Sequence, residues 1–212
     1  MPIASPSTIF QGKVPADLPI FVCDLSDQRE VLDLARAALD DLRRDHPEST
    51  PSNVKAVYMS PWKSHVLTDK LLPLCKTACW VARQAAHRIC TFDLSFIEVD
   101  MVVTDCWIAV YEEGDRTVRH NHFPADFGCV VYLEAEPGCA PLVFAGKTAH
   151  QPTPGSMVMF PGILDHEVPA TPGRRVVVAM NLAKRSTMFA DGPMPSAPVP
   201  ASVPAQAAAS VA

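Results

Sequence analysis

The sequence predicts an α+β fold in which two N-terminal helices pack on the outside of a jelly-roll barrel. Two stretches before residue 90 have apolar residues at helical spacing. Beyond residue 92 the chain contains a series of short apolar, β-branched runs, each bounded by Gly, Pro or Asp. Short strands repeated at roughly ten-residue spacing are typical of an all-β sandwich or barrel.

The first helix is predicted to start after Ser26 and Asp27, because small polar residues cap helix N-termini. Its apolar residues recur every three or four positions and form one stripe: Val31, Leu32, Ala35, Ala38, Leu39 and Leu42. Arg43 and Arg44 suit the negative end of the helix dipole, so we expect the helix to end near them.

The second helix is predicted to begin near Thr68 or Asp69 and to run to about Ile89. Pro73 falls in its opening turns, where a missing backbone N–H costs no helical hydrogen bond. Residues 53–65, between the two helices, are irregular in pattern and contain aromatic side chains. We therefore expect this segment to pack against the core.

The strand-rich half begins with a long β-branched and aromatic run over residues 96–113. Shorter runs of the same character follow it, at residues 117–122, 128–134, 141–144, 156–160 and 174–182. Helices followed by such a series of strands predict helices on the outside of a jelly roll.

The length of 212 residues suits one domain with tails. We expect a flexible N-terminus at residues 1–15 and a single folded domain at residues 16–186. From Asp191 onward the chain is rich in Pro, Ala and Ser and has no aromatic residue. Residues 187–212 are therefore predicted to form a disordered tail.

Composition excludes several classes of function. The net charge is −5 and there is no basic run, which argues against binding to nucleic acid. No apolar stretch reaches the ~18 residues that a membrane span needs, and the N-terminus has no signal-peptide pattern. The 7 cysteines are odd in number and include no C-x-x-C pair, so we expect neither a disulfide framework nor a cysteine zinc site. A reducing, cytoplasmic location is the corresponding prediction.

Three histidines are the candidate metal ligands. His120 and His122 form an H-x-H in a predicted strand, where alternation places both side chains on one face. His166 follows about four short strands later, which in a jelly roll returns the chain beside its starting point. Asp126 offers a carboxylate soon after the H-x-H. Such ligands suit a catalytic iron, and also manganese, nickel or zinc. In the other interpretation, the histidines are only exposed strand-end and loop residues.

Two adjacent arginines, Arg174 and Arg175, begin the last apolar run. Alternation sends their side chains to opposite faces of a strand, so only one can point into the barrel. Burying a guanidinium is costly unless it meets an anion, and its fork matches a carboxylate. We expect Arg175 to point inward, because it shares parity with Val177 and Ala179, and Arg174 to be solvated.

The order of these motifs resembles the 2-oxoglutarate/Fe(II)-dependent oxygenases of bacteria and phages, which are prolyl-hydroxylase-like. The resemblance rests on a Trp and Tyr strand, Gly-Asp, H-x-H, a Phe-Pro turn, a histidine, and then Arg and Asn on the last strand, all within residues 107–182. The segment at residues 53–67, with its Trp and Ser before a helix, also looks like that family. The similarity covers about residues 50–183.

This resemblance implies a double-stranded β-helix that binds Fe(II) and 2-oxoglutarate. His166 matches the distal metal histidine of the family, and Arg175 matches the arginine that grips the far carboxylate of 2-oxoglutarate. Tyr111 and Trp107 match the strand that lines the cosubstrate pocket. Asn181 matches a family asparagine to which we assign no role from the sequence.

One departure from the family concerns the metal ligands. Better-known members use H-x-D, whereas this chain has His122 at the place of the aspartate. Either His120 and His122 both bind the metal with His166, giving a catalytic three-histidine site, or Asp126 supplies the carboxylate.

The spacing also resembles the cupin pattern, which belongs to the same type of barrel. The matching residues are Gly114, His120, His122, Asp126, Gly155, Pro161, Gly162 and His166. Cupins include enzymes that need no 2-oxoglutarate and non-catalytic binding modules, so both alternatives stay open at this point. The feature that separates them is Arg175, because a solvent-facing Arg175 would leave the cosubstrate without an anchor.

The leading hypothesis is an Fe(II)- and 2-oxoglutarate-dependent dioxygenase that uses O2 to hydroxylate a small molecule or a peptide. Oxidative decarboxylation of 2-oxoglutarate to succinate and CO2 would accompany the hydroxylation. Small amino acids, peptides and natural-product scaffolds are all open as substrates, and no feature of the sequence specifies an oligomeric state.

Overall fold

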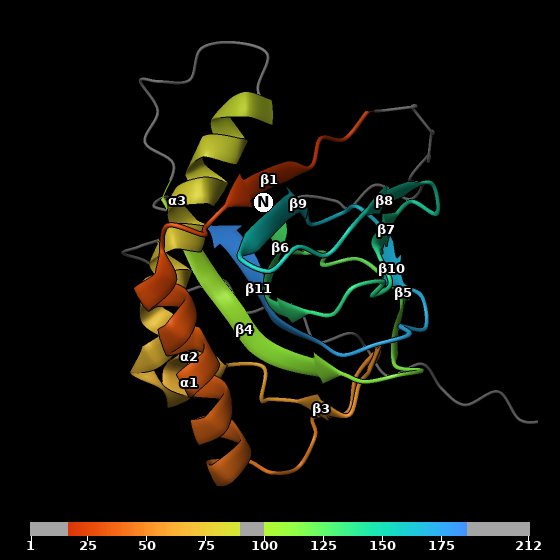
Figure 1. Cartoon of the computed structure of the whole chain (residues 1–212). Helices are drawn as coiled ribbons and strands as arrows, with labels where there is room; N and C mark the ends of the chain where they lie inside the picture. Colours follow the sequence, from red (N-terminus) through yellow and green to blue (C-terminus); the bar gives the residue numbers. More distant parts are fainter. Residues whose placement is uncertain (1–16, 90–99, 186–212) are drawn as a thin grey trace, which may run out of the picture.

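The computed structural model describes residues 17–89 and 100–185 (Figure 1). The predicted flexible N-terminus at residues 1–15 and the predicted tail at residues 187–212 lie outside the described residues. Figure 1 shows three layers, in which the helices lie on one side of a twisted sheet and a second sheet lies on its other side.

The strands form two sheets in which all neighbouring strands are antiparallel. The larger sheet has the order β1 (Phe21–Asp24), β9 (Ser156–Pro161), β6 (Phe127–Ala135), β11 (Arg175–Lys184), β4 (Met101–Tyr111) and β3 (Tyr58–Met59). The smaller sheet has the order β2 (Val54–Lys55), β5 (Arg116–His120), β10 (His166–Val168), β7 (Leu142–Phe144) and β8 (Thr148–His150).

The path of the chain through these sheets is that of a jelly roll. From β4 to β11 the chain alternates between them: β4, β6, β9 and β11 lie in the larger sheet, and β5, β7, β8 and β10 lie in the smaller one. Four strands, β6 to β9, separate β5 from β10, and these two strands pair side by side. The predicted double-stranded β-helix, in which the chain returns beside the H-x-H, is therefore confirmed.

The helices are α1 (Arg29–Asp45), α2 (Ser64–Leu67), the 3-10 helix η1 (Asp69–Leu71) and α3 (Leu72–Ile89). Both long helices predicted from the sequence are present, and they cover the outer face of the larger sheet (Figure 1). Helix α1 begins at Arg29, slightly later than the capping residues suggested, and its N-cap Gln28 makes no side-chain hydrogen bond. No helix in the described ranges is long and apolar enough to cross a membrane.

Alternation along β4 divides the interior into two apolar cores. Cys106 and Ile108 point toward the helices and belong to the outer core, between the larger sheet and α1 and α3. Trp107 and Tyr111 point the other way and belong to the inner core, between the two sheets. Each fully buried large aliphatic side chain stabilises the fold by roughly 1.5–3 kcal/mol.

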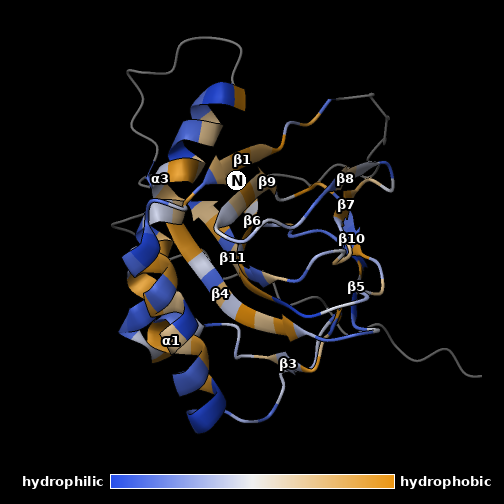
Figure 2. Ribbon diagram, in the orientation of Figure 1, coloured by the Kyte–Doolittle hydropathy of each residue, from blue (hydrophilic) through white to orange (hydrophobic). Residues whose placement is uncertain are grey.

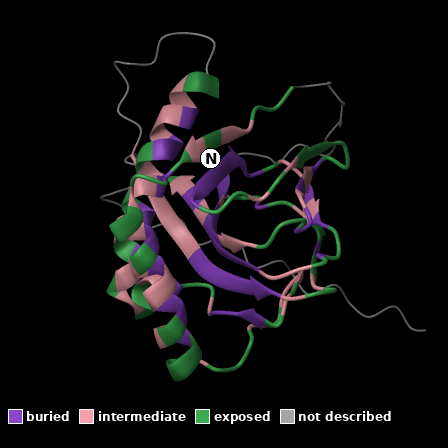
Figure 3. Cartoon of the chain, in the orientation of Figure 1, coloured by how far each residue is buried: buried purple, intermediate pink, exposed green. Residues whose placement is uncertain are grey.

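Hydropathy and burial agree with this division. Figure 2 shows helices that are polar on their outward side and apolar toward the sheet, as the apolar stripe of α1 predicts. Figure 3 shows that the buried residues concentrate in the strands of the larger sheet, between the helices and the smaller sheet. The core thus supports the inner face of the larger sheet, which carries part of the candidate site.

The strands that the sequence did not reveal are β1, β2, β3, β8 and β10, none longer than 4 residues. Runs this short show no measurable periodicity, and they become strands only because neighbouring strands provide backbone partners.

Candidate metal centre

Three histidines meet at one end of the barrel, between the two sheets. His120 is the last residue of β5 and His166 is the first residue of β10, and the two stand directly opposite each other in the sheet. His122 lies in the loop after β5, where its backbone N–H donates to the carbonyl of Gly162 at 2.7 Å. The expectation that His120 and His122 lie within one strand is therefore wrong, because β5 ends at His120.

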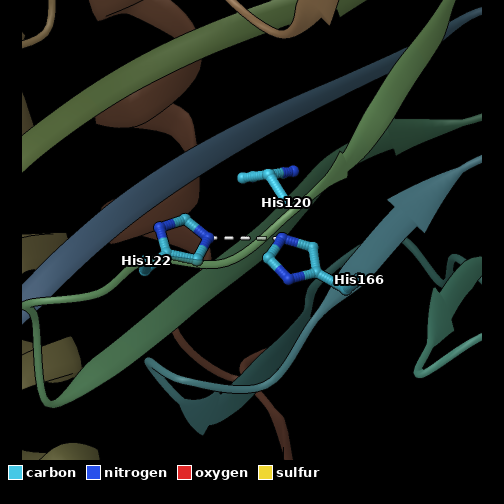
Figure 4. A group of neighbouring side chains, drawn as sticks. All are labelled: His120, His122 and His166. Carbon is cyan, nitrogen blue, oxygen red and sulfur yellow. Dashed lines mark hydrogen bonds between the residues drawn. The ribbon is translucent and has the colours of Figure 1, made fainter.

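The loop nevertheless brings the His122 ring into the same cluster (Figure 4). The ring centroid of His122 lies 5.2 Å from that of His120 and 4.9 Å from that of His166. His120 and His166 are closer still, at 4.3 Å. One ligand nitrogen from each of the three residues lies within 4.8 Å of the other two. The structure thus gathers all three predicted histidines.

The hydrogen bonds of the cluster define which ring nitrogen carries the proton. In His120 and His166, Nδ1 lies 2.9 and 3.1 Å from the carbonyl oxygen two residues earlier in the chain. In His122, Nδ1 lies 2.5 Å from the side-chain oxygen of Asn181. All three partners can only accept, so Nδ1 is the protonated nitrogen and Nε2 has a free lone pair. Fixing a ring in this way prepares Nε2 for a metal ion.

Asn181 acquires a role that the sequence did not assign. Its side-chain oxygen accepts from His122, and its amide nitrogen donates to Oδ2 of Asp105 at 3.1 Å. Thr104 donates its hydroxyl to the same carboxylate oxygen at 3.1 Å. Asn181 is thus a positioning residue that connects an imidazole to a carboxylate of β4.

The electrostatic surroundings keep these imidazoles neutral. Burial lowers the pKa of His122 to about 4, with a smaller contribution from the neighbouring His120. Burial also lowers the pKa of His166 to about 3, and both other histidines add to this effect. The pKa of His120 is lowered for the same reason, desolvation. Neutral imidazole is the form that binds metal ions.

The arrangement fits a divalent metal ion. Nε2 of His122 lies 3.2 Å from Nε2 of His166, the contact marked by the dashed line in Figure 4. With both protons on Nδ1, two lone pairs face each other, which is unfavourable without a cation. Metal–imidazole bonds are about 2.0–2.1 Å long, so two ligands at right angles around one ion have nitrogens about 3 Å apart. The three imidazoles suit iron or another transition metal.

Asp126 lies outside this cluster. Its carboxylate accepts a hydrogen bond from the backbone N–H of Lys184 at 2.6 Å, and its own backbone N–H donates to Leu182. The metal-competent group in the described residues consists of the histidines alone. Of the two ligand sets that the sequence left open, the structure brings together the three-histidine set.

Arg175 points into the barrel. Its side chain is 2% exposed, and its guanidinium lies over the ring of Tyr111, 4.3 Å from the ring centroid. One nitrogen, Nη1, donates to the carbonyl of Ala140 at 3.2 Å. Within residues 17–89 and 100–185, Nε has no hydrogen-bond partner, and no carboxylate forms an ion pair with Arg175. A buried cation so incompletely satisfied is the expected feature of an anion site.

Arg174 faces the other way, as parity predicts. Its guanidinium forms ion pairs with Glu112 at 2.5 Å and with Glu134 at 3.3 Å. About a third of the Arg174 side chain is exposed, so these are surface contacts of modest energy. The two adjacent arginines therefore lie in opposite environments.

A small cavity of about 30 Å³ connects Arg175 with the histidines. It is lined by side chains of both sheets, namely Val54, Trp107, Tyr111, Thr117, His120, His122, Val130, Leu142, His166, Val168, Arg175, Val177 and Ala179. Trp107 and Tyr111, for which the family resemblance implies a place beside the cosubstrate, are both part of this lining. The hydroxyl of Tyr111 is hydrogen-bonded to that of Thr117 at 2.7 Å.

Tyr132 is a polar residue of the barrel interior that the sequence analysis missed. It is fully buried, its hydroxyl has no hydrogen-bond partner among the described residues, and burial raises its pKa to about 12. Tyr132 stands opposite Val177 in the sheet, and Val177 shares its face with Arg175. Alternation from Val130, in the predicted strand at residues 128–134, was the signal that could have found it.

A second and larger space, of about 410 Å³, opens on the other side of the histidines. We call it the outer pocket. It is lined by Asn53, Trp62, Thr104, Asp105, Trp107, His120, Asn121, His122, Phe123, Pro124, Ala125, Asn181 and Ala183. The metal centre thus stands between an inner cavity with a buried arginine and an outer pocket of small-molecule size.

Comparison with solved structures agrees with this architecture. A prolyl-4-hydroxylase from Pseudomonas putida superposes with a TM-score of 0.54 at 17% identity, over 78% of this chain and 92% of the other. The chain has the fold of the 2-oxoglutarate/Fe(II) oxygenases. The non-haem α-ketoglutarate-dependent epimerase SnoN from nogalamycin biosynthesis gives a TM-score of 0.57 at 14% identity, covering 81% of this chain and 82% of the other.

A third similar structure is a prolyl hydroxylase from Trichoplax adhaerens in complex with a peptide fragment of a hypoxia-inducible factor. It superposes with a TM-score of 0.50 at 14% identity, over 78% of this chain and 82% of the other. No family model matches the sequence, and no curated protein matches it. The oxygenase fold expected from the motifs is therefore confirmed by structure at low sequence identity.

Proposed function

We propose that the protein is an Fe(II)- and 2-oxoglutarate-dependent oxygenase that hydroxylates a small molecule or a peptide. One observation carries the proposal: the buried guanidinium of Arg175 and the three histidines line the same cavity inside the barrel. A metal-binding module without a diacid cosubstrate has no need for a buried, largely unpaired arginine, which is costly to keep.

His120, His122 and His166 would hold the iron. Bound there together with 2-oxoglutarate, Fe(II) supplies the activation of O2 that converts a C–H bond of the substrate to C–OH while the cosubstrate becomes succinate and CO2. The protein's part is to keep Nε2 of each ring unprotonated and correctly oriented, which the hydrogen bonds of Nδ1 achieve. The apolar walls of the inner cavity limit the access of water.

The far carboxylate of 2-oxoglutarate would meet Arg175. Nε of Arg175 and the hydroxyl of Tyr132 are both buried and both lack partners among the described residues. Tyr132 stands opposite Val177, which lies on the same face of the larger sheet as Arg175. Tyr111 supports the site by stacking beneath the guanidinium and fixing its plane.

The substrate would enter from the outer pocket, whose wall includes His120 and His122. Its volume of about 410 Å³ is in the usual range for a small ligand or one side chain of a peptide. The hypoxia-inducible-factor peptide bound by the Trichoplax prolyl hydroxylase supports including peptides among the candidate substrates.

The proposal is tested by succinate formation. The full-length protein is incubated with Fe(II), ascorbate, O2 and 2-oxoglutarate, without any further substrate, and we expect slow, iron-dependent release of succinate. His122→Ala should abolish the reaction, whereas Asp165→Asn, a change near the cluster that leaves the three ligands intact, should preserve it. If neither succinate release nor binding of 2-oxoglutarate to the iron-loaded protein is detected, the proposal fails.

The second candidate is a cupin-type metalloenzyme that does not use 2-oxoglutarate. Two observations favour it: the ligands are all imidazoles, and the inner cavity of about 30 Å³ has room for only one or two water molecules. Binding a five-carbon diacid would require cavity side chains to move. In this case the protein would bind stoichiometric metal, but 2-oxoglutarate would neither bind nor be consumed.

We also propose a cytoplasmic location. Six cysteines fall within the described residues, and all of them are free thiols, as a reducing compartment favours. The expectation that the protein does not bind nucleic acid stays a prediction from its acidic composition.

A further inference from the structure

The outer pocket has aromatic walls and one carboxylate. Trp62 and Trp107 pack edge to face, with ring centroids 4.8 Å apart, and Phe123 is 74% exposed at the rim. Asp105 is the only acidic residue of the lining, and the lining contains no lysine or arginine. Aromatic faces beside a single carboxylate attract organic cations.

Asp105 presents a free oxygen. Both of its side-chain hydrogen bonds in the described residues, from Thr104 and Asn181, go to Oδ2. The support of the metal centre through Asn181 therefore uses one oxygen of the carboxylate. Oδ1 receives no hydrogen bond within the same residues, which leaves an acceptor at the wall of the pocket.

The carboxylate of Asp105 forms no ion pair with any cationic side chain in the described part of the chain. A half-buried carboxylate in this position gains most from a cation supplied by a ligand.

We propose that the outer pocket binds a substrate through an organic cation, an alkylammonium or guanidinium group, held by Oδ1 of Asp105 and by the face of Trp62 or Trp107. This inference rests on the proposed function, because it names the substrate class of the same site. Binding of the cation at Asp105 would direct the neighbouring carbon atoms of the substrate toward the side of the pocket that His120 and His122 line. It also predicts that uncharged analogues of the same shape bind poorly.

The test compares a cation with its neutral isostere. Butylguanidinium and butylurea have nearly the same shape and differ in charge, and their dissociation constants are measured by ligand-observed NMR on the full-length, Zn(II)-loaded protein. We expect butylguanidinium to bind at least about tenfold more tightly. Asp105→Asn should remove this preference, whereas Asp165→Asn, the same charge change outside the pocket lining, should retain it. Metal content is measured for each variant.

A second variant avoids the hydrogen-bond network of the metal centre. Trp62→Leu should weaken butylguanidinium more than butylurea, because only the cation interacts with the ring quadrupole. N-acetylarginine methylamide, tested alongside, distinguishes a peptide-borne cation from a free one by which of the two binds more tightly. Equal binding of the charged and neutral probes, absence of binding by either, or an unchanged preference in Asp105→Asn would overturn the inference. None of these measurements uses 2-oxoglutarate or O2, so failure of the proposed oxygenase activity is detected separately.

Discussion

Replacing Arg175 by methionine should weaken 2-oxoglutarate binding without weakening the fold. Methionine fills a similar volume with apolar atoms and removes a charge that is 2% exposed and has no carboxylate partner in the described residues. If Arg175 were structural, its loss would destabilise the protein. If it serves a ligand, the ligand-free protein keeps it at a cost, and its removal relieves that cost.

The magnitudes favour the second outcome. The mutation loses the charge-assisted hydrogen bond to Ala140, which contributes about 1.5–3 kcal/mol. It also loses the cation–π contact with Tyr111, about 2 kcal/mol when desolvated. Against these stands the desolvation of a guanidinium, several kcal/mol per buried ion. The free energy of unfolding should therefore either decrease by no more than about 1–2 kcal/mol or increase. Binding of 2-oxoglutarate should weaken at least about tenfold.

Two measurements check this prediction. Urea unfolding of the metal-free protein gives the free energy of unfolding, and calorimetric titration of 2-oxoglutarate into the anaerobic Fe(II) protein gives the affinity. Arg174→Met is the matched control: its ion pairs with Glu112 and Glu134 are partly exposed, so it should cost less than about 1 kcal/mol and leave 2-oxoglutarate binding unchanged. A folded Arg175→Met protein that binds 2-oxoglutarate like its parent would refute the reasoning and favour the cupin-type alternative.

Three further predictions concern the metal. His166→Ala should abolish stoichiometric iron binding, measured by metal analysis after reconstitution, and full iron occupancy in this variant would refute the three-histidine site. Asp126→Asn should leave the metal affinity within about twofold of the parent, because its carboxylate is bonded to the backbone of Lys184 and lies outside the cluster; a large loss would restore Asp126 as a ligand. Asn181→Ala should reduce metal affinity about 10–100-fold, measured by competition with a chelator, because His122 loses its orienting partner; an unchanged affinity would show that the ring needs no such support.

Most of the barrel could be predicted from the sequence because its long strands carry their own signal. The β-branched run that became β4 and the apolar run that became β11 pair with each other over ten positions, and their alternation decides which side chains face the barrel. Strands such as β2 and β10 could not be predicted in this way. They span 2 and 3 residues, and their partners lie far away along the chain.

The candidate site shows the same division between local and long-range information. Parity alone separated Arg175 from Arg174, because Arg175 is the first residue of β11 and Arg174 directly precedes it. Parity also predicted that the His122 ring lies beside that of His120, and it does. The reason is different, however: His122 lies in a loop, held by the hydrogen bond from its backbone N–H to the carbonyl of Gly162. The place of Asp126 depends on a backbone contact with a strand more than fifty residues away, which no local pattern encodes.

The three-histidine ligand set also changes how charge is distributed around the metal. Three imidazoles are neutral, so an Fe(II) ion bound to them keeps its full double charge, whereas an H-x-D site offsets part of it within the ligand set. Here Asn181 connects His122 to Asp105, so a carboxylate interacts with the ligand through an amide rather than with the metal itself. Such a partner would make the imidazole a stronger donor toward a bound metal. Since the same Asp105 borders the outer pocket, the residue that would support the metal would also place a negative charge beside a substrate bound there.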